Sequence, residues 1–205
     1  MDILYKLFAP LKYKKIKHQQ KSIVDVYLPL IVAVLSAIMC IFVPEPVVIL
    51  GEDGLLKSLS GYLQFLTGFF VASVAAIATF PNKNMDVITD GIALRLNGEQ
   101  LTRRQFLSYL FGYLAFLGLM LVAIGGVAEL FEKNIQLLLT LSTSMLLMIF
   151  KGVFLIIYLY YVFSIMFITL YGLYYLTEKI HENKAEFTGE VGNAAESKDE
   201  RGNNP

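Results

Sequence analysis

The chain carries little charge for its length and few of the side chains on which enzyme chemistry commonly depends. Of its 205 residues, 17% are charged and 56% are hydrophobic, with one cysteine and two histidines. Roughly a quarter of the residues in a soluble domain are charged. Because Cys40 is the single cysteine, an intrachain disulfide is excluded, and cysteine usage does not indicate the redox compartment.

Catalytic and metal-binding patterns are also missing from the sequence. His18 and His181 lie in polar flanks, and neither has a nearby cysteine or carboxylate at the spacing of metal ligands. No segment resembles a phosphate-binding glycine loop, a nucleophile elbow or a His-Glu-x-x-His zinc helix. We therefore expect no enzyme activity, no metal and no cofactor.

Long apolar stretches fill most of the chain. The hydrocarbon core of a bilayer is about 30 Å thick and needs roughly 20 apolar residues to cross it. The sequence therefore predicts an all-α polytopic membrane protein with four transmembrane helices between residues 23 and 182. We expect them at Val26–Val43, Leu59–Phe80, Thr102–Leu130 and within Ile135–Leu176.

The loop at residues 81–104 and the helix that follows it have specific local signals. Alternating apolar residues before Asn97-Gly98 predict a small hairpin, which we expect to pack against another subunit or a partner. Thr102 with Gln105 three residues later forms a capping-box pattern, flanked by Leu101 and Phe106 at the hydrophobic-staple positions. A helix is therefore predicted to begin directly after Thr102.

The last apolar segment, Ile135–Leu176, permits two interpretations. As one helix it would be about 63 Å long, twice the hydrocarbon thickness, and would protrude with its surplus surface covered by neighbouring helices. Alternatively, residues 135–150 form a separate short span or re-entrant piece that turns at Lys151-Gly152.

The distribution of positive charge favours the interpretation with four spans, in which Ile135–Leu176 crosses the membrane once. Six lysines precede the first span and four basic residues occupy or flank the second connection, but only Lys57 and Lys133 lie in the first and third connections. Because positive residues favour the cytoplasm, residues 1–22 and the loop 81–104 are predicted to be cytoplasmic. Four spans then return the C-terminus to the cytoplasm, where the polar tail 183–205 is predicted to be disordered. The N-terminal segment is either a short interfacial helix or a solvated tail.

Candidate contact residues form three groups. Small residues at helical spacing predict close packing between helices or subunits in lipid; they are Gly68, Ala72, Ala76, Gly112 and Gly118. Three arginines, Arg95, Arg103 and Arg104, are candidates for contact with lipid phosphate or an acidic partner. Lys151 either extends to the outer headgroups, forms a charged ring in an oligomer, or pairs with Glu129 or Glu132. We expect Asp25 and Glu129 to be ordinary residues of the membrane interfaces.

The size and layout of Met1–His181, together with Leu101–Leu107 and Phe111–Leu114, resemble the membrane subunit of the Kiwa anti-phage defence system. The resemblance implies a homo-oligomeric sensor in the bacterial inner membrane that works with a cytosolic DNA-binding protein. It assigns no role to individual residues. We expect contact with membrane lipids, a homo-oligomer such as a tetramer, a cytosolic protein partner and no direct binding of nucleic acid. An oligomeric channel or pore-forming effector is the alternative.

Overall fold

The computed structural model describes residues 7–16, 21–42, 48–51, 54–81, 85–88, 94–134 and 144–179. Four long helices dominate these residues, and a two-stranded hairpin joins the second helix to the third. Shorter 3₁₀-helical (η1) and π-helical (η2, η4) segments precede the first long helix and end the last one. In chain order the elements are η1 Ala9–Lys15, η2 Ile23–Tyr27, α2 Leu28–Phe42, α3 Leu55–Thr79, β1 Arg95–Leu96, β2 Glu99–Gln100, α4 Arg103–Leu130, α6 Ser144–Tyr174 and η4 Tyr175–Lys179.

Four segments of the described chain are long and apolar enough to cross a membrane. They are Ile23–Cys40, Leu55–Thr79, Arg103–Leu130 and Gly152–Thr177. The prediction of an all-α polytopic protein with four transmembrane helices is confirmed, and each observed span overlaps its predicted range.

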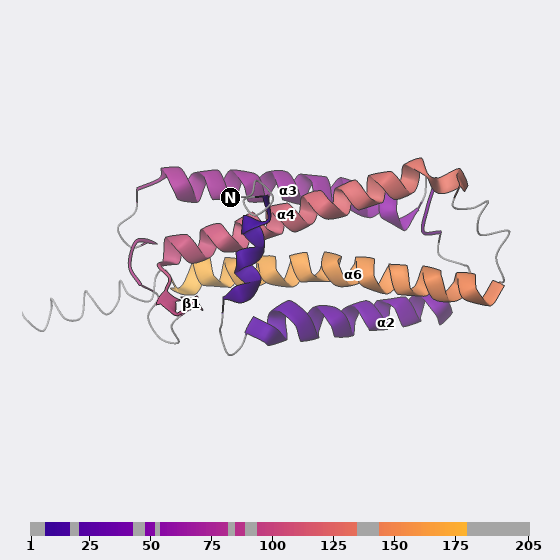
Figure 1. The fold of residues 1–205 in the computed structure, drawn as a ribbon, viewed down its shortest axis with the longest axis horizontal. Coiled ribbons are helices and arrows are strands. Elements are labelled where there is room, and N and C mark those ends of the chain that lie inside the picture. Colours follow the sequence, from indigo (N-terminus) through magenta and orange to yellow (C-terminus); the bar gives the residue numbers. More distant parts are fainter. Residues whose placement is uncertain are drawn as a thin grey trace, which may run out of the picture.

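The long helices lie roughly along one direction, and their main contacts run in the order α3, α4, α6, α2 (Figure 1). Half of the Arg103–Leu130 span is buried inside the protein, against 17% of Ile23–Cys40. Helix α4 is therefore the central helix, whereas α2 lies at the edge and packs mainly on α6 through Ala33 and Ala37. The hydrophobic core is built chiefly on α4, with Phe106, Leu110 and Leu114 fully buried.

The predicted start of α4 is confirmed in atomic detail. Thr102 Oγ1 accepts a hydrogen bond from the Gln105 backbone N–H at 3.2 Å, and Gln105 Oε1 accepts one from the Thr102 backbone N–H at 3.1 Å. These bonds satisfy two backbone donors that a helix start would otherwise leave without partners. Leu101 and Phe106 are both buried in the same core, as the staple pattern predicts.

The predicted hairpin is also present. Arg95 pairs with Gln100 and Leu96 with Glu99, around a two-residue turn in which Asn97 has φ +53° and Gly98 φ +95°. Positive φ at both positions is the requirement of the type I′ turn that Asn-Gly favours. The structure shows that the hairpin packs on its own chain, because the flanking Leu94 and Leu101 are buried in the core. Ile92 and Ala93, which belonged to the predicted alternation, lie outside the described residues.

Helix α6 runs without interruption through Lys151-Gly152, so of the two interpretations the turn at this dipeptide is excluded, and the continuous helix of the four-span interpretation is observed from Ser144 onward. Its 31 residues correspond to about 47 Å, which exceeds the hydrocarbon thickness. Its C-terminal end packs on α4, where Phe106 contacts the rings of Tyr171 and of Tyr175 in η4, whereas Ile149 and Phe150 near its start are exposed. Residues 135–143 lie outside the described part of the chain.

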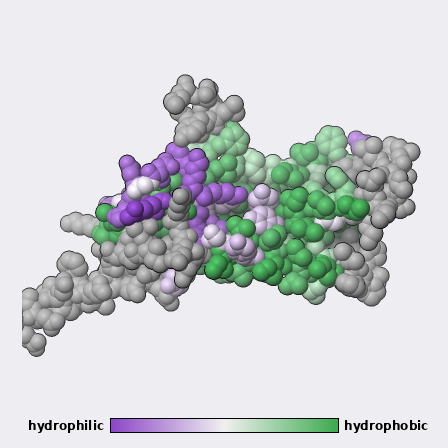
Figure 2. Space-filling model, turned by 60° about the horizontal axis from the view of Figure 1, so that its bottom comes forward, coloured by the Kyte–Doolittle hydropathy of each residue, from purple (hydrophilic) through white to green (hydrophobic). Residues whose placement is uncertain are grey.

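Hydrophilic and hydrophobic surfaces are separated along the molecule. Figure 2 shows hydrophilic residues gathered toward the end at which the hairpin lies, and hydrophobic residues over the rest of that face. We call this end, formed by β1, β2 and the first turns of α4, the hairpin end. Helices α2 and α4 begin toward it and α3 and α6 end there (Figure 1).

Candidate functional site: a buried anchor for the N-terminal segment

The basic N-terminal segment does not stay apart from the helices. Its 3₁₀ helix η1 begins around Pro10 and lies across the long helices, packed against α4 (Figure 1). Tyr13 is fully buried, and its ring stacks on that of Tyr113 with 5.0 Å between centroids. Phe8 makes an edge contact with Phe116 further along α4, at 5.9 Å. The sequence left open an interfacial helix or a solvated tail, and the described part is a 3₁₀ helix packed on α4, whose contact with lipid headgroups stays a prediction.

Tyr13 is held by a buried ion pair at the start of the first span. Lys21 Nζ lies 3.1 Å from Asp25 Oδ2 and donates a hydrogen bond to the Tyr13 carbonyl oxygen at 2.8 Å. The Tyr13 hydroxyl donates to Asp25 Oδ1 at 3.2 Å, and Lys21 Nζ lies 4.0 Å from the centre of the Tyr13 ring. Both carboxylate oxygens and the ammonium group thus have partners. We call Tyr13, Lys21 and Asp25 the N-terminal anchor.

Burial shapes the protonation of the anchor. It lowers the pKa of the Lys21 amine, and the nearby Asp25 carboxylate opposes that shift. Burial, together with Asp25, raises the pKa of the Tyr13 hydroxyl well above its ordinary value. Tyr13 therefore remains a neutral hydrogen-bond donor at physiological pH.

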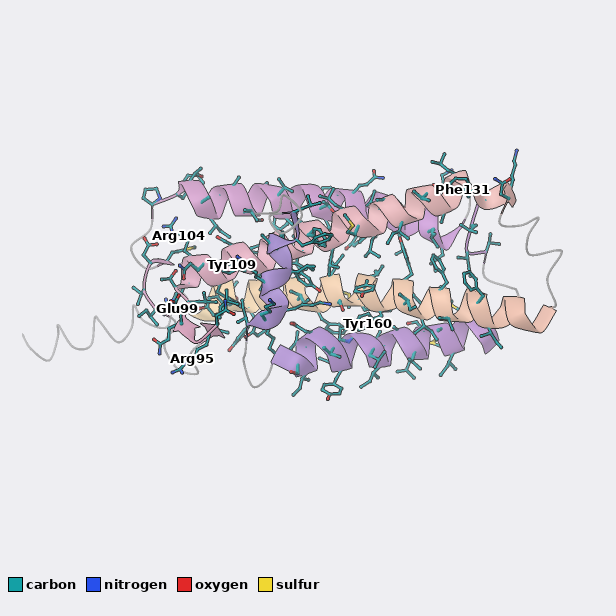
Figure 3. The ribbon with its side chains drawn as sticks, in the orientation of Figure 1. Arg95, Glu99, Arg104, Tyr109, Phe131 and Tyr160 are labelled. Carbon is teal, nitrogen blue, oxygen red and sulfur yellow. The ribbon has the colours of Figure 1, made fainter. Side chains whose placement is uncertain are left out.

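The anchor connects elements that are distant in sequence. The Tyr160 hydroxyl of α6 donates to the backbone carbonyl of Asp25 at 3.4 Å, which ties α6 to the start of the first span. Lys14 Nζ lies 5.9 Å from the ring centres of both Tyr113 on α4 and Tyr161 on α6. Segment η1 thus contacts α4 and α6, and the hydrogen bond from Tyr13 to Asp25 connects it to η2 at the start of the first span. Tyr160 is labelled in Figure 3, where it lies between α6 and α2.

The three candidate arginines have different surroundings. Arg104 donates to both carboxylate oxygens of Asp86, at 2.7 and 3.4 Å, and to the carbonyl oxygens of Ile77 and Phe80 at 2.7 and 3.2 Å. Its guanidinium group thus fastens the loop to the end of α3. Arg103 is buried, at 3% exposure. Arg95 is exposed on the hairpin (Figure 3), which leaves it as the candidate best placed for lipid or partner contact.

The five predicted packing residues also have different surroundings. Gly118 is used within the chain, because a Cβ atom at that position would overlap Oγ1 of Thr67 on α3. Gly68 and Gly112 have open space where a Cβ atom would stand, and Ala72 is exposed while Ala76 is half-buried. Open space at Gly68 and exposure of Ala72 leave this side of α3 available for a second copy, which stays a prediction.

The backbone of Lys151 lies in α6, and its side chain lies outside the described residues. Sequence reasoning missed the anchor, because Asp25 was interpreted as an ordinary interface residue. The signal that was available is the i, i+4 spacing of Lys21 and Asp25 at the start of a span, which places opposite charges on one helix face. The burial of Tyr13 has no comparable local signal, because it depends on residues more than ninety positions away.

No family model, curated protein or solved structure matches the chain. In the described residues no three His, Cys, Asp or Glu side chains are grouped as a metal ion would require. Fold and site together define an all-α, multi-pass membrane protein whose N-terminal segment is anchored to its spanning helices.

Proposed function

We propose that this protein is a sensor or anchor subunit of the bacterial inner membrane that binds a cytosolic partner at its hairpin end. The single observation that supports this most strongly is the N-terminal anchor. It links a basic segment to η2 at the start of the first span and to α4, and η2 is itself bonded to α6. A partner that binds this segment therefore changes contacts that the segment makes with the spanning helices.

The orientation follows from charge. Six lysines precede the first span, and Arg95, Arg103 and Arg104 belong to the same end. Cytoplasmic loops of membrane proteins are enriched in such residues. We accordingly place the hairpin end and both termini in the cytoplasm. Arg103 and Arg104 maintain this orientation and the loop structure, whereas Arg95 serves contact with the partner.

Anti-phage defence is the biological setting that we propose, on the resemblance in size and layout to the Kiwa membrane subunit. The protein then acts as a homo-oligomer, and a DNA-binding partner rather than this chain contacts nucleic acid. The open side of α3 at Gly68 and Ala72 supports self-association, because small residues permit close approach of helices in lipid.

Replacement of Arg95 by alanine tests the proposed partner surface. We expect the affinity for the soluble product of a neighbouring gene, measured by co-purification, to weaken roughly ten- to a hundredfold, because a charge-assisted hydrogen bond contributes about 1.5–3 kcal/mol. Protection against phage should fall in parallel, with membrane insertion and oligomer mass unchanged. Lys133→Ala, an exposed cation beyond the other end of α4, is the matched control. Full partner binding by Arg95→Ala would move the contact surface to η1 or η4.

An oligomeric channel is the second candidate. Glu129 lies in the Arg103–Leu130 span with one carboxylate oxygen buried, and ionisable residues within spans often mark ion pathways in membranes. Expression of the chain alone, followed with a potential-sensitive dye, separates the two functions. A sensor leaves the membrane potential intact without its partner, whereas a constitutive pore collapses it.

A further inference from the structure

The 3₁₀ helix η1 and the two residues before it have one buried and one exposed surface. Tyr13 is fully buried against α4, whereas Leu7 and Phe8 are 60% and 47% exposed, and Lys14 and Lys15 are exposed as well. Apolar side chains next to lysines on one exposed surface are typical of segments that lie in the headgroup region of a membrane. The depth at which η1 packs on the helices decides whether it reaches this region.

Helix α4 shows where the hydrocarbon core ends. Phe8 contacts Phe116, and the exposed large apolar side chains of α4 begin only at Leu119, about one turn further along. Tyr113, on which the tyrosine of η1 stacks, precedes the exposed Lys133 by 20 residues, which correspond to about 30 Å of helix, the thickness of the hydrocarbon core. With Lys133 at one boundary of the core, the other boundary lies at η1.

The direction of η1 and its neighbours agree with this position. The segment lies across the long helices at the level where α2 begins (Figure 1), so it runs parallel to the membrane surface when the helices cross the bilayer. Tyrosine is enriched at membrane–water interfaces. The rings of Tyr13, Tyr113 and Tyr161 gather at this level, the last two around Lys14. Helix η1 therefore lies in the plane of the headgroups.

The charge of the segment selects the headgroup. Asp25 has both carboxylate oxygens bonded within the anchor, one to Lys21 and one to Tyr13, so it does not present its charge to the surrounding lipid. Lys14 and Lys15 are exposed and do present theirs. Basic residues at a membrane surface attract anionic lipids, and ammonium groups form charge-assisted hydrogen bonds with phosphate oxygens. An anionic phospholipid fits this surface better than a zwitterionic one, whose headgroup carries its own cation.

We propose that the exposed surface of η1 is a binding site for anionic phospholipid, in which Leu7 and Phe8 enter the acyl-chain region and Lys14 and Lys15 bind the phosphate. Lipid then covers the segment from the outside, while Tyr13 holds it from the inside. The site goes beyond the proposed function, since it involves no cytosolic partner and exists in either orientation of the protein. An acidic protein bound to the same lysines is the competing occupant, which the test distinguishes.

The chain contains no tryptophan, so a single introduced tryptophan reports on its own position alone. The test uses full-length Leu7→Trp in phosphatidylcholine vesicles with increasing fractions of phosphatidylglycerol or phosphatidylcholine whose brominated acyl chains quench tryptophan fluorescence on contact. We expect half-maximal quenching at a several-fold lower fraction of brominated phosphatidylglycerol, because each lysine near an anionic surface strengthens binding roughly fivefold. Leu119→Trp, at an exposed position within the hydrocarbon core, is the control and should be quenched equally by both lipids.

Charge variants separate a lipid-binding site from general exposure to the bilayer. Added to Leu7→Trp, the double change Lys14→Gln/Lys15→Gln should make the two brominated lipids equally effective, whereas Lys14→Arg/Lys15→Arg should keep the preference for phosphatidylglycerol. Equal quenching by both lipids in Leu7→Trp itself would overturn the proposal, as would a preference that survives the glutamine changes. Absence of quenching by either lipid would also overturn it, because η1 would then lie outside the bilayer with its lysines open to an acidic protein.

Discussion

The side chains that distinguish this protein are a few polar ones at positions where lipid or core would ordinarily require apolar groups. Lys21 and Asp25 are 7% and 13% exposed, and each depends on the other and on Tyr13 for its hydrogen bonds. A buried ion pair seldom adds much net stability over an apolar pair of similar size, but removal of one partner leaves a buried charge without compensation. The anchor therefore specifies where η1 packs more than it stabilises the fold.

Single and double substitutions of Lys21 and Asp25 measure the net contribution of the ion pair to the free energy of unfolding. Asp25→Ala should lower the free energy of unfolding by about 3–5 kcal/mol, because Lys21 would stay buried and charged. The double variant Lys21→Met/Asp25→Leu should lose clearly less free energy of unfolding than Asp25→Ala, because no buried charge is left without a partner. Denaturant titration in mixed micelles gives both values. A double variant at least as unstable as Asp25→Ala would contradict this account of the anchor.

The contact of Gly118 with Thr67 permits an equally specific prediction. Gly118→Ala places a methyl group against Thr67 Oγ1 and should cost about 1–3 kcal/mol through overpacking. Adding Thr67→Ala removes the clash and should restore most of the stability, since that hydroxyl donates only to the carbonyl of Leu63 in its own helix. Gly112→Ala, where the space is open, is the control and should be nearly neutral. Failure of the double variant to recover would mean that α3 and α4 are not packed as described.

At the scale of elements, local sequence patterns predicted local structure well. The capping box at Thr102 and the Asn97-Gly98 hairpin each depend on a few adjacent residues, and both are present. Tertiary packing was harder to anticipate. The residues that flank the hairpin, Leu94 and Leu101, are buried in the core of the same chain, whereas its contact with a partner stays a prediction. The packing of η1 requires Tyr113 and Phe106 on a helix that the sequence cannot place beside it.

The start of α4 offers an element-scale test. Thr102→Ala should lower stability by about 1 kcal/mol, because the Gln105 backbone N–H would lose its acceptor. Thr79→Ala is the matched control at the end of α3, where the exposed hydroxyl donates to the carbonyl of Ala75 at 2.8 Å. Equal losses in the two variants would show that the capping box contributes nothing specific.

At the scale of the whole molecule, α2 lies at the edge and α3 has an open side, which leaves apolar side chains such as Ile31, Leu35 and Phe65 exposed. Gly68 lies on that side of α3 with no atom near its missing Cβ. If a second copy packs there, Gly68→Leu should reduce the mass of the purified particle while the unfolding of each protomer stays unchanged. Gly126→Leu, at an equally open position on α4, is the control. A particle mass unaffected by Gly68→Leu would remove this residue from any oligomer interface.

The central claim is that the hairpin end, with its anchored N-terminal segment, faces the cytoplasm. Cys40 is the single native cysteine, so Cys40→Ala provides a background without thiols. In it we would introduce Lys15→Cys in η1, Asn97→Cys at the hairpin and Lys133→Cys beyond the far end of α4, all at exposed positions.

Labelling of these variants with a membrane-impermeant maleimide, before and after permeabilisation of the inner membrane, is the most direct measurement. The account predicts that Lys133→Cys reacts in intact cells, whereas Lys15→Cys and Asn97→Cys react only after permeabilisation. Labelling of Asn97→Cys in intact cells would contradict the orientation, and with it the proposal that a cytosolic partner binds at the hairpin end.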